Sequence, residues 1–112
     1  MPYIQVSTSC AITDGQELAM KTQIGKAIEL IPGMKEAYMM LRFDGSSHLY
    51  FGGESDCAFL EVRRFGLVPA DAAEALTARL TEIVSETLGL SPARIYVQYL
   101  QAPYWGCRGH NF

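Results

Sequence analysis

Cysteine and histidine are scarce in the sequence, and their spacing excludes the common disulfide and metal frameworks. The three cysteines, Cys10, Cys57 and Cys107, are odd in number, lie far apart and form no CxxC pair. The two histidines, His48 and His110, stand at no metal-binding spacing from each other, from a cysteine or from a carboxylate. We therefore expect no metal site, and we interpret the cysteines as small core residues and the histidines as loop residues.

Long apolar runs and an excess of positive charge are also missing. No segment approaches the roughly 18 apolar residues that a membrane span needs, and the N-terminus carries no secretion signal pattern. We therefore expect a cytoplasmic protein without membrane contact, with release by a non-classical route as the alternative. Twelve acidic residues against nine lysines and arginines give a net charge of −3, which repels phosphate backbones, so nucleic acid is not an expected partner.

The composition is that of one folded domain. Of the 112 residues, 49% are apolar and 19% are charged, which is enough to build a core in a domain of ordinary size. We expect a single domain over residues 1–112 with two pseudo-repeats, at about 2–55 and 56–112, each in the order strand, helix, glycine, strand.

Four segments have the pattern of β-strands. Apolar and polar residues alternate over Pro2–Ser9 and Ala58–Phe65, which predicts half-buried strands. The run Ala37–Phe43 is almost unbroken in apolar residues, which predicts a strand buried on both faces. A further strand is expected over Ile95–Leu100, and the tail Gln101–Phe112 is aromatic and rich in glycine.

Two segments have helical periodicity. Thr13 and Gln16 can form a capping box at the start of the first helix, which Pro32-Gly33 ends. The second helix begins near Pro69 and ends at Gly89. The residues expected to face the core are Leu18, Ile24, Ile28 and Ile31 in the first helix, and Leu76, Leu80, Ile83, Val84 and Thr87 in the second.

The order of these elements predicts an α/β (α+β) fold made of a tandem βαβ repeat. Strands joined by a helical crossover run parallel, so we expect a four-stranded mixed sheet with two helices on one face. The opposite face is expected to be apolar and therefore to be covered by other copies of the chain in a closed homo-oligomer.

Several short motifs occur in a fixed order along the chain. They are Met1-Pro2, Phe51-Gly52-Gly53 with Cys57-Ala58, Phe65-Gly66, the stretch Leu90-Ser91-Pro92-Ala93-Arg94-Ile95-Tyr96-Val97, Trp105-Gly106 and Asn111-Phe112. With these motifs the chain resembles the macrophage migration inhibitory factor group of the tautomerase superfamily over essentially its whole length. The resemblance implies a homotrimer of duplicated βαβ units and a keto-enol tautomerase of phenylpyruvate type that needs no cofactor.

Pro2 is the candidate catalytic residue. Once the initiator methionine is removed, its nitrogen is a secondary amine and the only backbone nitrogen that can act as a base. Burial in an apolar pocket disfavours the cation and lowers the pKa of such an amine, so that it can move a proton between carbon and oxygen of a keto-enol substrate near pH 7. A chain that retains Met1 has an amide nitrogen at this position and is expected to be inactive.

The resemblance implies a pocket around Pro2, with the last strand pair contributed by a neighbouring subunit. The lining positions are Tyr38, Phe65, Tyr96, Gln98, Trp105, Cys107 and Phe112. Tyr96 is the second catalytic candidate, because its hydroxyl can hydrogen-bond the substrate carbonyl or steady the amine. Gln98 stands in place of the usual asparagine and Cys107 in place of a second tryptophan. The aromatic lining favours a small aromatic α-keto acid as substrate.

The residue that binds the substrate carboxylate is left open between Lys35 and Arg64. Similar proteins usually have a lysine directly after the glycine that ends the first helix, whereas Met34 holds that position here and Lys35 comes next. Arginine can hold a carboxylate with two parallel hydrogen bonds, which makes Arg64 a candidate, while we favour a solvated surface role for Arg108.

These departures leave a second function open. The displaced lysine, Gln98 and Cys107 are compatible with a cytokine-like trimeric protein that binds a protein receptor and retains weak or vestigial tautomerase activity. An enzyme of the same fold with a different substrate is a further alternative, which the sequence does not separate from the first.

Overall fold

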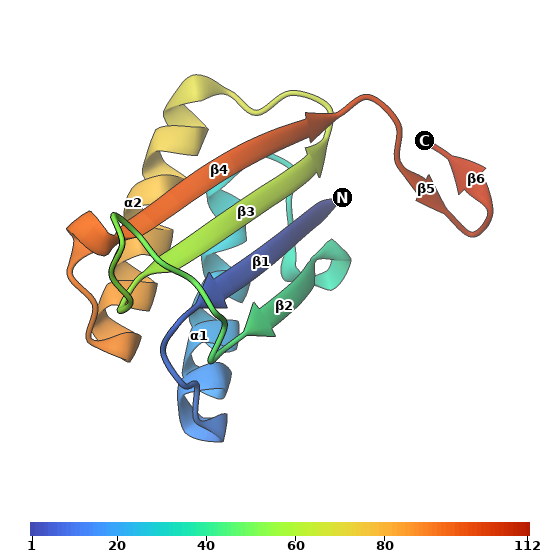
Figure 1. The fold of residues 1–112 in the computed structure, drawn as a ribbon. Helices are drawn as coiled ribbons and strands as arrows, with labels where there is room; N and C mark the ends of the chain where they lie inside the picture. The colour runs from blue at the N-terminus through green and yellow to red at the C-terminus, as the bar shows by residue number, and fades with distance from the viewer.

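The computed structural model describes all residues, 1–112, as a four-stranded sheet with two helices on one face (Figure 1). The strands are β1 (Pro2–Thr8), β2 (Met40–Asp44), β3 (Ala58–Phe65) and β4 (Ile95–Ala102), and the helices are α1 (Asp14–Ala27) and α2 (Ala70–Leu88). Single 3₁₀ turns lie at η1 (Ile28–Leu30), η2 (Glu36–Tyr38) and η3 (Pro92–Arg94). The C-terminal arm, residues 103–112, carries the short strands β5 (Gly106–Cys107) and β6 (His110–Asn111).

The strand order is β2-β1-β3-β4. The pairs β1/β2 and β3/β4 are parallel, because a helix connects the strands of each pair, and the central pair β1/β3 is antiparallel. The predicted tandem βαβ repeat, the mixed sheet and the placement of both helices on one face are confirmed. No helix combines the length and the apolar character that a membrane span requires.

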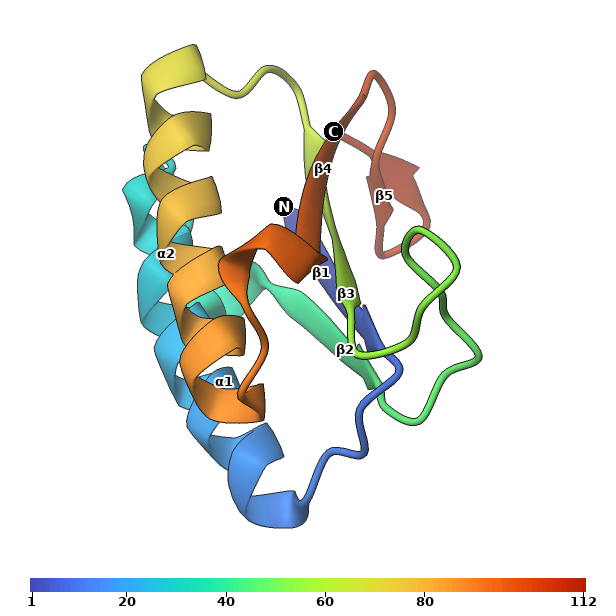
Figure 2. The same ribbon diagram turned by 60° about the vertical axis from the view of Figure 1, so that its left-hand side comes forward.

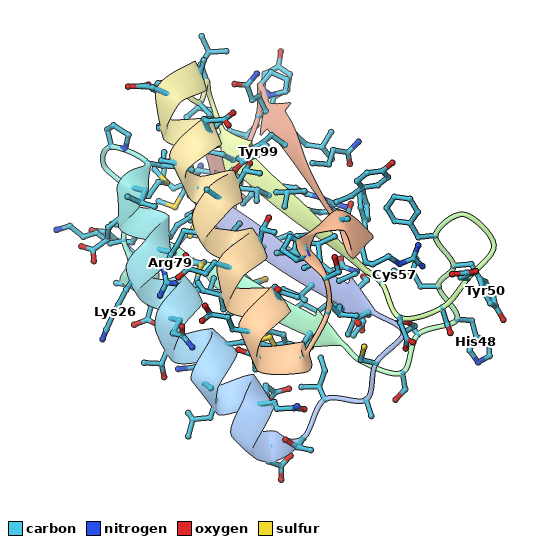
Figure 3. The ribbon with its side chains drawn as sticks, turned by 90° about the vertical axis from the view of Figure 1, so that its left-hand side faces the viewer. Lys26, His48, Tyr50, Cys57, Arg79 and Tyr99 are labelled. Carbon is cyan, nitrogen blue, oxygen red and sulfur yellow. The ribbon has the colours of Figure 1, made fainter.

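The core lies between the sheet and the helices. Strand residues with a period of two, such as Ile4, Val6, Leu60 and Val62, are buried against the helices. On α2 the buried residues include Leu76, Leu80, Ile83 and Val84, as the periodicity predicts. Tyr99 of β4 is also directed at α2, where its hydroxyl lies 2.9 Å from both the Thr77 hydroxyl and the Ala73 carbonyl oxygen (Figure 3).

The end signals of the helices act largely as expected. Thr13 and Gln16 form the reciprocal capping box, with bonds of 2.9 and 3.1 Å between each backbone nitrogen and the other side chain. Gly89 ends α2 in the left-handed conformation, φ 72°. The prediction for Leu18 is wrong, because this side chain is 63% exposed and Met20 is buried instead. Two residues span about 200° of a helix, so these two side chains lie on nearly opposite faces.

A core leucine and the exposed leucine of α1 provide a matched stability test. We expect Leu80→Ala to lower the free energy of unfolding by about 2 to 5 kcal/mol, because it leaves a cavity between the sheet and the helices. Leu18→Ala is expected to change it by less than about 0.5 kcal/mol, because the side chain is solvated. Urea denaturation followed by circular dichroism measures both, and equal losses for the two variants would contradict this core.

The segment 37–43 differs from its prediction. The part up to Tyr38 is a 3₁₀ turn, and the strand begins only at Met40. This strand is not buried on both faces: β2 is at the edge of the sheet, the helices cover one face only, and Met40 is 69% exposed. An apolar run does not reveal whether a strand is central or at an edge, because that depends on which other strands pair with it.

The sheet face opposite the helices is polar in its middle, so the expectation of an apolar face is wrong. Arg42, Gln5, Glu61 and Gln98 stand beside one another across all four strands. Figure 2 shows that only the segment between β2 and β3 and the C-terminal arm lie on this side. The strand alternation places these polar side chains here, because their neighbours in sequence face the helices.

Candidate active site

A cleft of about 700 Å³ opens beside the N-terminus. Figure 1 shows that this end of β1 lies next to the ends of β3 and β4, where the C-terminal arm departs. Nine of the 13 lining residues are hydrophobic. Its aromatic residues are Tyr3, Tyr38, Tyr104 and Trp105. The cleft therefore suits a ligand with an aromatic or other apolar part.

Pro2 lies in the wall of this cleft and is buried. The antiparallel pairing of β1 with β3 places Pro2 beside Arg64. The backbone amide of the next residue, Phe65, donates to the carbonyl oxygen of Met1 at 3.3 Å. That carbonyl is bonded to the Pro2 nitrogen, so the Phe65 amide points at the immediate surroundings of this nitrogen.

The electrostatics at the N-terminus favour a neutral amine. Burial lowers the pKa of the Met1 amine below its ordinary value of 8.0, and the nearby Arg64 guanidinium lowers it further. The Met1 nitrogen also lies 3.5 Å from the sulfur of Met34. A thioether is a weak acceptor and does not stabilise a cation as a carboxylate would.

Four of the predicted site residues line this cleft. Tyr38, Trp105 and Cys107 line it together with Pro2. Phe65 and Phe112 are not among its lining residues; their rings lie 6.1 Å apart, and the Phe112 amide donates to the carbonyl oxygen of the lining residue Trp105 at 2.9 Å. Cys107 is exposed and Cys10 is half-buried, so only Cys57 is a core cysteine. His110 lies in β6, not in a loop.

Tyr96 and Gln98 lie away from Pro2 of the same chain. Along β3, Tyr96 stands beside Phe59 and Gln98 beside Glu61, whereas Pro2 stands beside Arg64. The five-residue offset of Tyr96 corresponds to roughly 17 Å along the strand. Within one chain, Tyr96 therefore cannot contact a substrate held by hydrogen bonds at Pro2.

Tyr96 instead borders a second cleft, of about 320 Å³, at the other end of the sheet. Its ring centroid is 4.5 Å from that of Phe51, whose ring also has the Arg94 guanidinium at 4.9 Å from its centroid. Tyr96 is 60% exposed and Tyr50 71% exposed. Figure 3 shows Tyr50 on the segment between β2 and β3, pointing away from the helices.

The candidate cations differ in their surroundings. Lys35 is exposed, directly before η2. Arg64 is half-buried and donates from Nη1 to the Leu67 carbonyl oxygen. Arg108 is exposed at the turn between β5 and β6. Arg63, which was not predicted as a site residue, lines the cleft and forms an ion pair with Glu61 at 2.9 Å.

Some residues that line the cleft were not predicted as site residues, although the pattern of their strands indicates which face they occupy. Tyr3, Met40 and Arg63 occupy the strand positions that alternate with core residues, so the period of two places them on the face away from the helices. Tyr104 is in the C-terminal arm, where no periodicity predicts its direction.

The family model described as macrophage migration inhibitory factor (MIF) matches residues 1–111. The chain belongs to the macrophage migration inhibitory factor family. The resemblance carried by the short motifs is thereby confirmed. No curated protein sequence matches the chain.

Solved structures of the MIF family have the same fold. MIF2 of Leishmania major superposes with a TM-score of 0.92 at 24% identity, covering 100% of this chain and 97% of its own. The macrophage migration inhibitory factor of Toxoplasma gondii superposes with a TM-score of 0.89 at 24% identity, covering 98% of this chain and 99% of its own. A fused 4-OT asymmetric trimer superposes with a TM-score of 0.85 at 16% identity, covering 97% of this chain and 94% of its own. At these identities the likeness concerns the fold alone.

Proposed function

We propose that the methionine-free protein is a keto-enol tautomerase of phenylpyruvate type with Pro2 as general acid-base. The observation that supports this most directly is the burial of Pro2 in the wall of an aromatic cleft, where burial and Arg64 lower the pKa of the amine that Met1 carries. A neutral secondary amine is a competent base near pH 7, and its conjugate acid returns the same proton. The reaction is an isomerisation, so it consumes no cofactor.

The proposed steps follow from the atoms around Pro2. The aryl group of the substrate packs among Tyr38, Trp105 and Phe112, and the Pro2 nitrogen takes the proton of the enol hydroxyl. The O–H electron pair then forms the carbonyl, and the carbon that loses the double bond takes the proton back from Pro2. With Met1 removed, the Phe65 amide that faces the Met1 carbonyl can donate to a substrate oxygen.

We further propose that the enzyme is a homotrimer in which a neighbouring chain supplies Tyr96 and Gln98. Both side chains are exposed on β4 and out of reach of Pro2 in their own chain, whereas the Tyr96 cleft is apolar and open. In a closed ring each chain can place this surface against the N-terminal cleft of the next. The Tyr96 hydroxyl then polarises the substrate carbonyl and the Gln98 amide orients it.

The test is the rate of ketonisation of enol-phenylpyruvate as a function of pH. We expect kcat/KM of the methionine-free protein to rise with pH and then to level off as the Pro2 amine loses its proton, and the surroundings that lower the pKa of the Met1 amine are expected to move this rise to lower pH. Protein that retains Met1, verified by intact mass, is the control and is expected to be inactive. Equal rates for the two forms would contradict the role of the Pro2 nitrogen.

Met34 is the observation that favours a cytokine-like binding protein as the second candidate. Its sulfur lies beside the terminal nitrogen, where similar proteins have a lysine. This candidate requires negligible turnover by methionine-free protein together with saturable binding to a receptor. Turnover without receptor binding would exclude it.

A further inference from the structure

We propose that Arg94 is a positioning residue, which fixes the direction of the Tyr96 side chain through Phe51 and the turn 51–56. The inference rests on the proposed function, because it concerns the hydroxyl that is assigned there to polarise the substrate carbonyl. Its basis is a cluster of contacts at the start of β4, at the opposite end of the sheet from Pro2.

Arg94 holds the turn 51–56 through its backbone. The Arg94 Nη2 donates to the carbonyl oxygens of Glu54 and Ser55 at 3.1 and 2.9 Å, and its Nε donates to that of Asp56 at 3.3 Å. These three acceptor residues are exposed, whereas Arg94 is half-buried and forms no ion pair. Hydrogen bonds from a charged donor are stronger than those between neutral groups. One side chain therefore ties three consecutive residues to the sheet.

The turn 51–56 has little other support. Its only backbone pairing joins Phe51 and Glu54, with two hydrogen bonds of 2.8 and 3.2 Å. The two residues between them are glycines with φ of 60° and 82°, and Asp56 also has a left-handed φ, of 60°. That conformation is unfavourable for a residue other than glycine unless its surroundings hold it. We therefore expect the turn to lose its shape when Arg94 is removed.

Phe51 links the turn to Tyr96. The guanidinium carbon of Arg94 lies 4.9 Å from the centroid of the Phe51 ring, and the Tyr96 ring centroid lies 4.5 Å from the same ring, at an angle of 41°. Both geometries are attractive, the first as a cation–π contact and the second as an aromatic pair. Arg94 and Tyr96 flank the buried Ile95, so they lie on the same side of the chain.

Tyr96 requires such a neighbour to keep one direction. Its side chain is 60% exposed, whereas the hydroxyl of Tyr99 on the same strand is fixed by Thr77 and by the Ala73 carbonyl. A group that polarises a carbonyl acts only when it is held close to the reacting geometry, and a small displacement costs a large factor in rate. Arg94 is thus expected to affect the chemical step without touching the substrate.

The first test is a kinetic comparison of methionine-free variants. In Arg94→Gln we expect kcat for enol-phenylpyruvate to fall about 10-fold and KM to change less than about 2-fold, because the aromatic lining beside Pro2 stays intact. Arg79→Gln changes the net charge equally, lies in α2 on the helix side of the molecule (Figure 3) and is expected to keep both wild-type values. A wild-type kcat in Arg94→Gln would overturn the proposal, and so would a raised KM with unchanged kcat.

The second test observes the Tyr96 ring without turnover. The chain has six tyrosines, which can be labelled as 3-fluorotyrosine and followed by fluorine NMR. The Tyr96 resonance is the one that disappears in Tyr96→Phe. Because the Phe51 ring current acts on it, we expect Arg94→Gln to shift this resonance and Arg79→Gln to leave it in place. An unshifted Tyr96 resonance in Arg94→Gln would overturn the proposal.

A conservative variant covers the case in which Arg94→Gln does not fold. Arg94→Lys keeps the charge, but an ammonium group cannot lie flat on Phe51 and reach all three carbonyl oxygens at once. It is expected to lower kcat about 3-fold and to shift the Tyr96 resonance. Wild-type values of both in Arg94→Lys would contradict the role of Arg94.

Failure of this proposal is separable from failure of the proposed function. Absence of enol turnover in the wild type would contradict the tautomerase, and the Tyr96 resonance would still decide whether Arg94 holds this ring. Turnover that is the same in Arg94→Gln and in the wild type would remove Arg94 from the mechanism and leave the tautomerase.

Discussion

Pro2→Gly is expected to lower kcat/KM for enol-phenylpyruvate by about 10²- to 10⁴-fold, the usual contribution of a positioned general acid-base. Glycine at position 2 leaves a primary amine without the pyrrolidine ring, so the nitrogen is no longer held by the buried ring of Pro2 at the start of β1. The loss is expected mainly in kcat, because the aromatic lining that binds the substrate is unchanged. The loss of kcat is measured by following the disappearance of the enol by its ultraviolet absorbance.

The matched control is Pro92→Gly, the same replacement at the start of η3 and outside the cleft lining. It is expected to leave kcat/KM at the wild-type value. Binding of 3-phenylpropanoate by the Pro2 variant, followed by Trp105 fluorescence, separates lost chemistry from a lost cleft. If Pro2→Gly and wild type had equal rates, Pro2 would have no part in the mechanism.

A mixture of two inactive variants is expected to regain activity. Pro2→Gly lacks the base, and Tyr96→Phe lacks the hydroxyl but keeps the ring that packs on Phe51. If each site takes Pro2 from one chain and Tyr96 from its neighbour, random co-refolding of equal amounts makes about a quarter of the sites intact. The mixture should then have about a quarter of the wild-type kcat, as measured in the enol assay after refolding together.

The same two variants refolded separately and then combined are the control, and they should stay inactive until subunits exchange. Activity of the co-refolded sample equal to the mean of the separate samples would contradict a shared site. In that case either Tyr96 takes no part in the reaction or the two residues act within one chain, which the register of β3 with β1 and β4 makes geometrically unfavourable.

Local sequence signals predicted most of the elements correctly. The capping box at Thr13, the left-handed Gly89 and the period of α2 depend on residues within a few positions of one another, so they are visible without a fold. The errors occurred where partners are distant in sequence. Leu18 fits a helical period but lies away from the sheet, and the apolar segment 37–43 forms an edge strand after a turn.

The candidate site shows the same division. Pro2 is a chemical candidate from its position alone, and Tyr38, Trp105 and Cys107 follow from the family motifs. Arg64 and Phe65 were also candidates from the family pattern, but only the pairing of β1 with β3, across more than sixty positions, places them at the N-terminus. Arg63 and Met40 enter the lining for the same reason.

The sequence by itself determined the repeat of strand, helix and strand, the start of α1 at its capping box, the end of α2 at Gly89 and the one backbone nitrogen capable of base catalysis. These properties are set by side-chain type, short-range periodicity and covalent chemistry. Only the tertiary structure decided which strand lies at the edge, which sheet face is polar, and that Arg64 stands beside Pro2 while Tyr96 lies at the far end of the sheet. The physical reason is that strand register, not sequence distance, fixes which groups are desolvated together, and register is set by the packing of the whole sheet against both helices.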